Sequence, residues 1–350
     1  MSDNQTMSVL LETNLPLPLF RRGKVRDVYD LGDKLLIVST DRVSAFDAVL
    51  PCGIPGKGEV LNQLSAFWFE KTRHIMPNHF IKVIDTLDAF QDVIASTPTV
   101  VTRTEIPRLS LRGTESRSNL LTGSEQAPQS QRGRDSSLAP LLRSGLLTSL
   151  VGRSMIVAKA KRIPVECIIR GYLAGSAWTE YKETGKVGDI PLPRGLKESE
   201  KLPQPIFAPT TKSDTEHDRP LSGRDIKNLG IEHLISELEE KSLLIYIYAH
   251  DYAKAKGIMI ADTKFEFGLI DRKLTLIDEL LTPDSSRFWD ACQYKVGFSQ
   301  ASFDKQPVRD WLLTSGWDKE SPPPMLPQEI VEGTAKRYRE VYSKLTGQIN

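Results

Sequence analysis

The chain has 350 residues, with 46 basic and 45 acidic side chains and a net charge of +1. This balance argues against a nucleic-acid-binding protein, which concentrates a basic excess. The chain has no apolar run of about 18 residues that could span a membrane, and its N-terminus lacks the pattern of a secretory signal. We therefore expect a cytoplasmic protein without nucleic-acid or membrane partners.

Residues 1–95 are typical of a small α+β domain. Short apolar strands at 25–31 and 34–40 flank a Leu-Gly-Asp turn and predict a hairpin. Helical spacing of apolar residues predicts a helix over 59–74, which we expect Pro77 to end.

Residues 96–150 lack sustained strand or helix periodicity. From residue 95 to 150 there are seven arginines, ten serines and no aromatic residue. Such a segment buries too little apolar surface to offset the entropy of ordering it, so we predict a disordered insert. A mis-annotated or unspliced segment is the alternative.

Residues 151–350 are expected to form a larger domain. It begins with two short strands separated by Pro164, and a Pro- and Gly-rich surface loop follows over 185–211. Helices are predicted across 225–256, with Gly257 at the position of a helix-ending glycine. Two further helical stretches flank the three prolines at 322–324.

The segment 258–280 reads as two strands joined by a three-residue turn. Because side chains alternate between faces along a strand, Asp262, Lys264 and Glu266 share one face. Pairing of Ile270 with Leu274 would then place Glu266 opposite Asp278. Two carboxylates beside a lysine suit a Mg²⁺–nucleotide site. The alternative is an edge hairpin with a solvated polar face.

A glycine-containing basic segment lies at the start of the first hairpin. Gly23 allows close approach of the backbone to a phosphate, and Lys24 and Arg26 flank Val25 with positive charge. The GxxxxGK[ST] spacing of a Walker loop is absent. A solvated basic turn is the alternative.

Polar groups also follow the second strand of this hairpin. Asp41, Arg42 and Ser44 come just after apolar residues, where site residues often lie. The alternative is a helix N-cap with ordinary ion pairs.

Two arginines in the larger domain are candidates for binding phosphate. Arg170 follows an apolar strand, and Ser176 could cap a helix beginning near residue 177. Arg287 lies just beyond the acidic hairpin, although it could instead pair with Asp290. A structural turn is the alternative around Arg170.

These motifs, taken in order, resemble the SAICAR synthetase family (phosphoribosylaminoimidazole-succinocarboxamide synthases), in the longer variety of fungi and many bacteria. The matching stretches are GKVRDVYD (23–30), STDRVSAFDAVLP (39–51), GIPGKGEVLNQLS (53–65), PVECIIRGYLAGSAW (164–178), KSDTEHD (212–218), DTKFEFG (262–268) and IDELLTPDSSRFWD (277–290).

The resemblance implies an α+β fold with a small antiparallel domain like the N-lobe of protein kinases and a larger α/β ATP-binding domain. It implies an ATP-dependent ligase that joins L-aspartate to carboxyaminoimidazole ribotide (CAIR) in purine biosynthesis, through an acyl phosphate. The sequence is compatible with a monomer or a small homo-oligomer.

The resemblance also implies a role for each matched residue. Those predicted to act in catalysis are Lys212, Asp218 and Lys264. ATP would contact Gly23, Lys24, Val25, Arg26 and Lys264, and Mg²⁺ would bind Glu266 and Asp278. The substrates would contact Asp41, Arg42, Ser44, Arg170, Ser176 and Arg287. A small-molecule kinase and a non-catalytic nucleotide- or ribotide-binding module are the two alternative functions.

Overall fold

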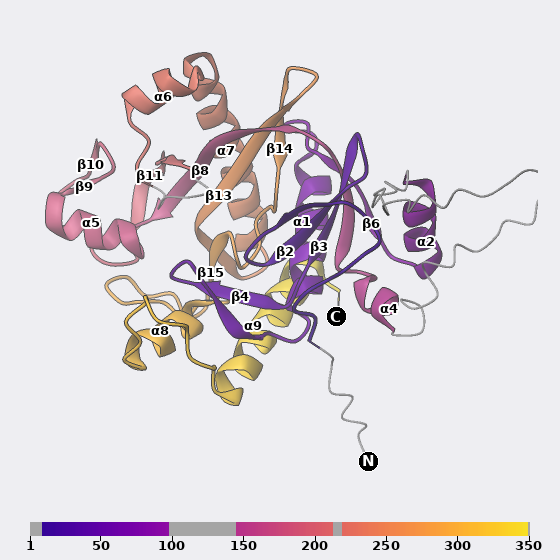
Figure 1. Cartoon of the computed structure of the whole chain (residues 1–350). Helices are drawn as coiled ribbons and strands as arrows, with labels where there is room; N and C mark the ends of the chain where they lie inside the picture. Colours follow the sequence, from indigo (N-terminus) through magenta and orange to yellow (C-terminus); the bar gives the residue numbers. More distant parts are fainter. Residues whose placement is uncertain (1–8, 98–144, 213–218, 349–350) are drawn as a thin grey trace, which may run out of the picture.

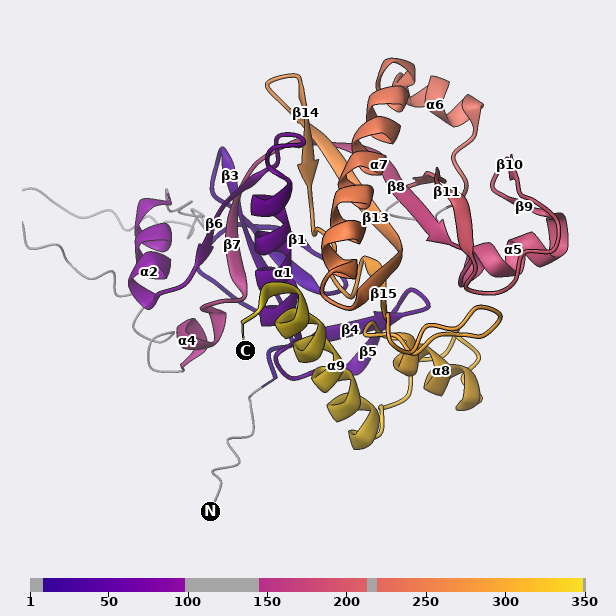
Figure 2. The same cartoon turned by 180° about the vertical axis from the view of Figure 1, so that it is seen from behind.

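The computed structural model describes residues 9–97, 145–212 and 219–348 (Figure 1). It has a mixed α+β architecture with two large antiparallel sheets. Helices α1 (Lys57–Thr72) and α7 (Glu232–Lys254) lie in front of the sheets in Figure 2. In the part of the chain described, no helix is long and apolar enough to cross a membrane.

The first sheet has five strands in the order β1-β2-β3-β7-β6. The predicted hairpin is confirmed as β2 (Arg26–Asp30) and β3 (Lys34–Ser39). Strand β7 (Ser154–Ala158) pairs with both β3 and β6, so this sheet takes a strand from the range that we had assigned to the larger domain. The remaining strands are β1 (Leu19–Arg22) and β6 (Phe80–Ile84), and a separate hairpin comprises β4 (Arg42–Ala45) and β5 (Ala48–Gly53).

The predicted N-terminal helix is confirmed as α1 (Lys57–Thr72). It ends before Pro77, so that proline is not its terminator. Two helices lie at the borders of the predicted insert: α2 (Leu87–Ser96) and α4 (Leu146–Leu150). The insert is therefore shorter at both ends than we predicted. Residues 98–144, on which the prediction of disorder mainly falls, lie outside the described residues.

The second sheet has the order β11-β8-β13-β14, with β15 also paired to β13 and β12 to β8. Strand β8 (Lys161–Tyr172) is one continuous strand, so the predicted break at Pro164 is wrong. This proline, which lacks an N–H donor, lies where the register with β13 shifts. The other strands are β11 (Lys201–Phe207), β12 (Thr210–Thr211), β13 (Ile258–Ile270), β14 (Lys273–Ile277) and β15 (Ser286–Asp290).

The predicted surface loop over 185–211 also needs correction. Strand β11 lies within it and pairs with β8, and its two prolines are tolerated because it is at the edge of the sheet. A small hairpin of β9 (Lys186–Val187) and β10 (Ile190–Pro191) precedes it.

The turn between β13 and β14 contains two residues rather than three. Ile270 pairs with Lys273, while Asp271 and Arg272 have φ values of +49° and +64°. Both central residues are left-handed in the type I′ turn that matches the twist of a two-residue hairpin. Glu266 is therefore opposite Ile277, and the predicted pairing of Glu266 with Asp278 is wrong by one residue.

One hydrophobic core joins the two sheets. It contains Ile37 of the first sheet, Phe265 of the second, and side chains from α1, α7 and α9. Helices α1 and α7 meet through Trp68 and Tyr252, whose ring centroids are 5.5 Å apart. The predicted helices after residue 222 are observed as α6 (Gly223–Leu229), α7 (Glu232–Lys254), α8 (Gln306–Thr314) and α9 (Gln328–Thr346).

Candidate active site

Strand β13 separates the core from a polar face. Phe265 and Phe267 are fully buried in the core, and the alternating residues Asp262, Lys264 and Glu266 point to the other side, as predicted. Residues two apart on a strand are about 6.6–6.8 Å apart. The three charged side chains thus form a row about 13 Å long, along which the neighbouring strands add further charges.

Two arginines meet at one end of this row. Arg170 of β8 and Arg287 of β15 are both paired with Asp262 across the sheet. Both guanidinium groups contact Oδ2 of Asp262, that of Arg170 at 3.3 Å. Two cations on one carboxylate leave a net positive charge, and the planar forks of arginine suit phosphate oxygens.

The turn before α5 (Ser176–Thr184) completes this end of the site. Arg170 Nη2 donates to the hydroxyl of Ser176 at 3.4 Å. Gly175 holds the N-cap position and Ser176 is the first helical residue, so the predicted capping by Ser176 is wrong. A Cβ on Gly175 would lie 2.3 Å from Nη2 of Arg287, and its φ is +57°. Glycine there allows Arg287 to pack against the turn.

Arg287 lies in a strand rather than on a helix surface. Asp290, the alternative partner that we considered for Arg287, lies 3.5 Å from Lys344 instead. The structure thus brings together Arg170, Ser176 and Arg287, three of the residues predicted to contact the substrates.

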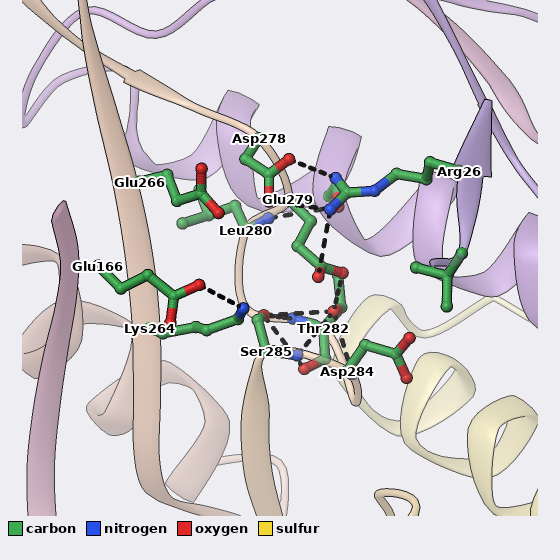
Figure 3. Close-up of polar contacts among 12 residues, drawn as sticks. Arg26, Glu166, Lys264, Glu266, Asp278, Glu279, Leu280, Thr282, Asp284 and Ser285 are labelled. Atoms are coloured by element: carbon green, nitrogen blue, oxygen red, sulfur yellow. Dashed lines mark hydrogen bonds and ion pairs between the residues drawn. The ribbon is translucent and has the colours of Figure 1, made fainter. Parts of the chain in front are cut away.

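Carboxylates dominate the other end of the row. Glu166 of β8 is directly opposite Glu266, an arrangement that is destabilising for like charges. Lys212 compensates by contacting both carboxylates, with 2.9 Å between its Nζ and Oε1 of Glu266. Lys264 Nζ donates to Oε1 of Glu166 at 2.9 Å (Figure 3). We did not predict Glu166, although its position four residues before Arg170 on the same strand places both on one face.

Arg26 reaches this acidic end from the first sheet (Figure 3). Its two terminal nitrogens bind both oxygens of Asp278, at 2.8 and 2.9 Å, and Nη2 lies 3.5 Å from Glu279. Asp278 follows β14 with a φ of +69°, and Figure 3 shows its side chain beside that of Glu266. The charge of Asp278 acts on Glu266 although the two residues are not paired across the hairpin.

The electrostatic environment shifts the pKa values of Glu266 and Asp278 in opposite directions. Burial raises the pKa of Glu266, and the charge of Asp278 raises it further, despite Lys212 and Lys264. Burial also opposes ionisation of Asp278, but the charge and hydrogen bonds of Arg26 lower its pKa well below the usual value. Asp278 is therefore firmly anionic, while the charge on Glu266 is incompletely compensated.

The two lysines remain cations. Burial alone would lower their pKa values, but Glu166 and Glu266 raise the pKa of Lys264 and of Lys212. They can stabilise negative charge, but they are poorly suited to act as general bases.

The donor set at the acidic end fits a magnesium ion. Mg²⁺ prefers hard oxygen ligands and commonly takes only one or two protein carboxylates, with phosphate and water in its other positions. Glu266 and Asp278 provide that number. Within the described ranges, no group of three or more His, Cys, Asp or Glu side chains could hold a metal by itself.

The glycine-containing segment lies next to Arg26 in the chain. The Gly23 N–H donates to the Arg26 carbonyl at 2.8 Å, and the Val25 carbonyl accepts from the Thr40 N–H at 3.0 Å. The half-exposed Lys24 side chain lies 2.5 Å from Asp47 in the β4–β5 turn. This turn therefore holds a lysine at the surface near the site.

The predicted substrate contacts after β3 mostly support the backbone. Asp41 is fully buried and accepts from the N–H groups of Leu10 and Gly58, each at 2.9 Å. Arg42 donates to the carbonyls of Gly23 and Lys24, at 2.9 and 3.1 Å, and thereby braces the glycine-containing segment. Ser44 lies in β4. Asp218 lies outside the described residues.

Comparisons with known proteins identify the family of the chain. The sequence profile of the SAICAR synthetase family matches residues 19–324. Phosphoribosylaminoimidazole-succinocarboxamide synthases of Thermodesulfovibrio yellowstonii and Rhodopirellula baltica are each 45% identical, over 97% of this chain and 99% and 95% of theirs.

Solved structures give the same assignment. The SAICAR synthase of Saccharomyces cerevisiae in complex with SAICAR superposes with a TM-score of 0.74 at 37% identity, covering 97% of this chain and 99% of its own. A SAICAR synthetase in complex with ADP has a TM-score of 0.59 at 25% identity, covering 94% and 98%. Sequence and structure together show that the chain belongs to the SAICAR synthetase family.

Proposed function

We propose that this chain activates the carboxylate of CAIR as an acyl phosphate, with ATP at the acidic end of the β13 face and the ribotide phosphate at the arginine end. Membership of the SAICAR synthetase family makes the chain an ATP-dependent ligase of purine biosynthesis, which converts ATP, CAIR and L-aspartate into SAICAR, ADP and phosphate. The observation behind this placement of the two substrates is the difference between the two ends of the β13 face: arginines gather at one end and carboxylates at the other.

The arginine end supports binding of the ribotide phosphate. Arg170 and Arg287 share the single carboxylate of Asp262, and Ser176 adds a hydroxyl. The two guanidinium groups would attract a phosphate anion and donate hydrogen bonds to its oxygens. Its position would place the rest of the ribotide along β13 toward Lys264.

The acidic end supports binding of the ATP phosphates with a metal ion. Glu266 and Asp278 would hold Mg²⁺, which neutralises phosphate charge when bound. Arg26 keeps Asp278 ionised and oriented. Lys24 could exchange its surface partner Asp47 for a phosphate oxygen.

The proposed reaction has two steps. An oxygen of the CAIR carboxylate forms a bond to the γ-phosphorus of ATP as the bond to the ADP oxygen breaks. The amine of L-aspartate then attacks the acyl carbon and loses a proton to solvent, and the bond from the acyl carbon to the phosphorylated oxygen breaks, so that inorganic phosphate leaves with that carboxylate oxygen. Lys264 and Lys212, which stay protonated, would stabilise the charge that develops on the transferred group and on the acyl oxygen.

The reaction is tested by following ADP release with CAIR present and L-aspartate added or withheld. A ligase requires aspartate for continuous ADP release, whereas a small-molecule kinase releases ADP without it and a binding module releases none. Heavy oxygen in the CAIR carboxylate should appear in the product phosphate. Phosphate without the label would exclude the acyl phosphate.

A further inference from the structure

A buried cation at the start of α1 has no place in the site described above. Lys57 is the first residue of this helix, and its side chain is 0% exposed. A positive charge is unfavourable at the positive end of a helix, and burying a charge costs several kcal/mol unless it is paired. The start of the helix lies so close to β3 that a Cβ at position 58 would be 2.2 Å from the Ser39 carbonyl oxygen. Only glycine allows this approach.

Asp284 compensates this charge and links three elements. Its Oδ2 accepts from Lys57 at 2.7 Å, and its Oδ1 accepts from the Tyr338 hydroxyl of α9 at 2.7 Å. Lys305 lies 3.9 Å from the same Oδ1. Although burial opposes ionisation, these cations and hydrogen bonds lower the pKa of Asp284, so the carboxylate stays charged.

Asp284 belongs to the loop that joins β14 to β15, and this loop is strained. Asp278 and Leu281 have φ values of +69° and +50°, a conformation that persists for non-glycine residues only where the surroundings impose it. The Thr282 hydroxyl donates to Glu279 at 2.7 Å and accepts from the Asp284 N–H at 3.2 Å (Figure 3). The contacts of Asp284 thus extend through the loop to the neighbour of Asp278.

We propose that Lys57, Asp284 and Tyr338 form a positioning anchor that sets the spacing between the two substrate sites. Asp278 at the ATP site begins the loop, and Arg287 at the ribotide site follows Asp284 by three residues. One carboxylate fastened to α1 and α9 therefore holds both. The identity of the two ligands rests on the proposed function.

The mildest test is Tyr338→Phe, which removes one hydrogen bond to Asp284 and keeps the ring. Because a displacement of about 1 Å can cost on the order of a hundredfold in rate, we expect kcat to fall about tenfold. Tyr252→Phe is the matched control: it removes a hydroxyl bonded to the Leu345 carbonyl of α9 and does not contact the loop. Equal kcat in both variants and the wild type would overturn the anchor.

A second test separates positioning from stability. Lys57→Met should lower both the unfolding midpoint and kcat, because it leaves Asp284 short of a partner. The double variant Lys57→Met/Asp284→Asn removes both charges of this pair and leaves Lys305 near position 284, so we expect the midpoint to recover in part while kcat stays low. Recovery of kcat together with the midpoint would mean that the pair serves stability alone.

Amide hydrogen exchange of the full chain tests the anchor without substrates. Tyr338→Phe should speed exchange at Leu280, Thr282 and Ser285, whose N–H groups bond to side chains in or beside the loop, and Tyr252→Phe should not. Unchanged exchange would reject the anchor even if the enzyme is active. If the wild type fails the aspartate-dependence test while exchange responds as expected, the proposed function fails and the anchor stands.

Discussion

Glu266 and Asp278 show how single residues create the site. Glu266 is paired with Ile277 rather than with Asp278, yet the charge of Asp278 still acts on Glu266. Asp278 gains a bidentate partner in Arg26, while Glu266 remains buried with incomplete compensation. A bound divalent cation would compensate the remaining negative charge of Glu266.

We predict that Glu266→Gln and Asp278→Asn each reduce Mg²⁺-dependent turnover by well over a hundredfold. Even changes to groups around a metal ligand commonly cost about 10–100-fold, and these variants would remove direct ligands. Glu266→Gln should fold normally, since the raised pKa means that its charge does not stabilise the fold. Steady-state ADP release tests this, with the exposed Glu237→Gln as control. Normal turnover in either folded variant would place the metal elsewhere.

Arg170→Ala and Arg287→Ala should each raise the KM for CAIR roughly ten- to a hundredfold and change the KM for ATP much less. Loss of a charge-assisted hydrogen bond costs about 1.5–3 kcal/mol, and both arginines lie at the end of β13 away from Glu266. Initial-rate kinetics measure both constants, with the exposed Arg194→Ala as control. The assignment fails if the KM for CAIR is unchanged in both variants.

At the scale of elements, the β13–β14 hairpin sets which residues the site receives. The two-residue turn fixes the register between β13 and β14, and Asp278 follows the end of β14 with a positive φ. The turn itself is at the end of β14 away from Asp278, so its sequence can be improved without touching the site.

We predict that Asp271→Asn combined with Arg272→Gly stabilises the chain by roughly 0.5–1 kcal/mol. Both positions have positive φ, and Asn-Gly is the preferred pair for a type I′ turn because the left-handed conformation is costly for other residues. Urea unfolding measures the gain, and turnover should be unchanged. Arg272→Ala, which keeps the backbone cost, is the control; a loss of stability in the Asn-Gly variant would contradict this account of the turn.

At the scale of the whole molecule, the buried acids make stability depend on pH. The folded chain lowers the pKa of Asp278 and Asp284 below their ordinary value of 3.8. Each therefore contributes stability that is fully present above that value and is lost as the pH falls through the lower pKa of the folded state. Glu266, whose pKa is raised, has the opposite effect and loses stability as the pH rises.

We predict that the urea midpoint of the wild type falls between about pH 5 and about pH 2, and that Asp284→Asn has a shallower dependence over this range. The variant is less stable at neutral pH but lacks one group whose protonation drives acid unfolding. Parallel curves for the two proteins would show that Asp284 has the same pKa in the folded and unfolded states.

The sequence by itself determined the alternation along β13, the helices α1, α7, α8 and α9, and most of the candidate residues for the chemistry. These features depend on local periodicity and on motifs that lie within short stretches of chain. Arg170, Arg287, Lys264, Glu266 and Asp278 could be named as site residues for that reason.

Only the tertiary structure decided how these residues meet. The contacts that build the site join residues from 46 to 252 positions apart in the chain. They are the contacts of Lys212 with Glu166 and Glu266, of Arg26 with Asp278, and of Lys57 with Asp284. Likewise, β7 joins the first sheet and β11 forms an edge of the second through pairing with distant strands. Such contacts depend on how the two sheets pack around a shared core, and local sequence preferences carry no information about that packing.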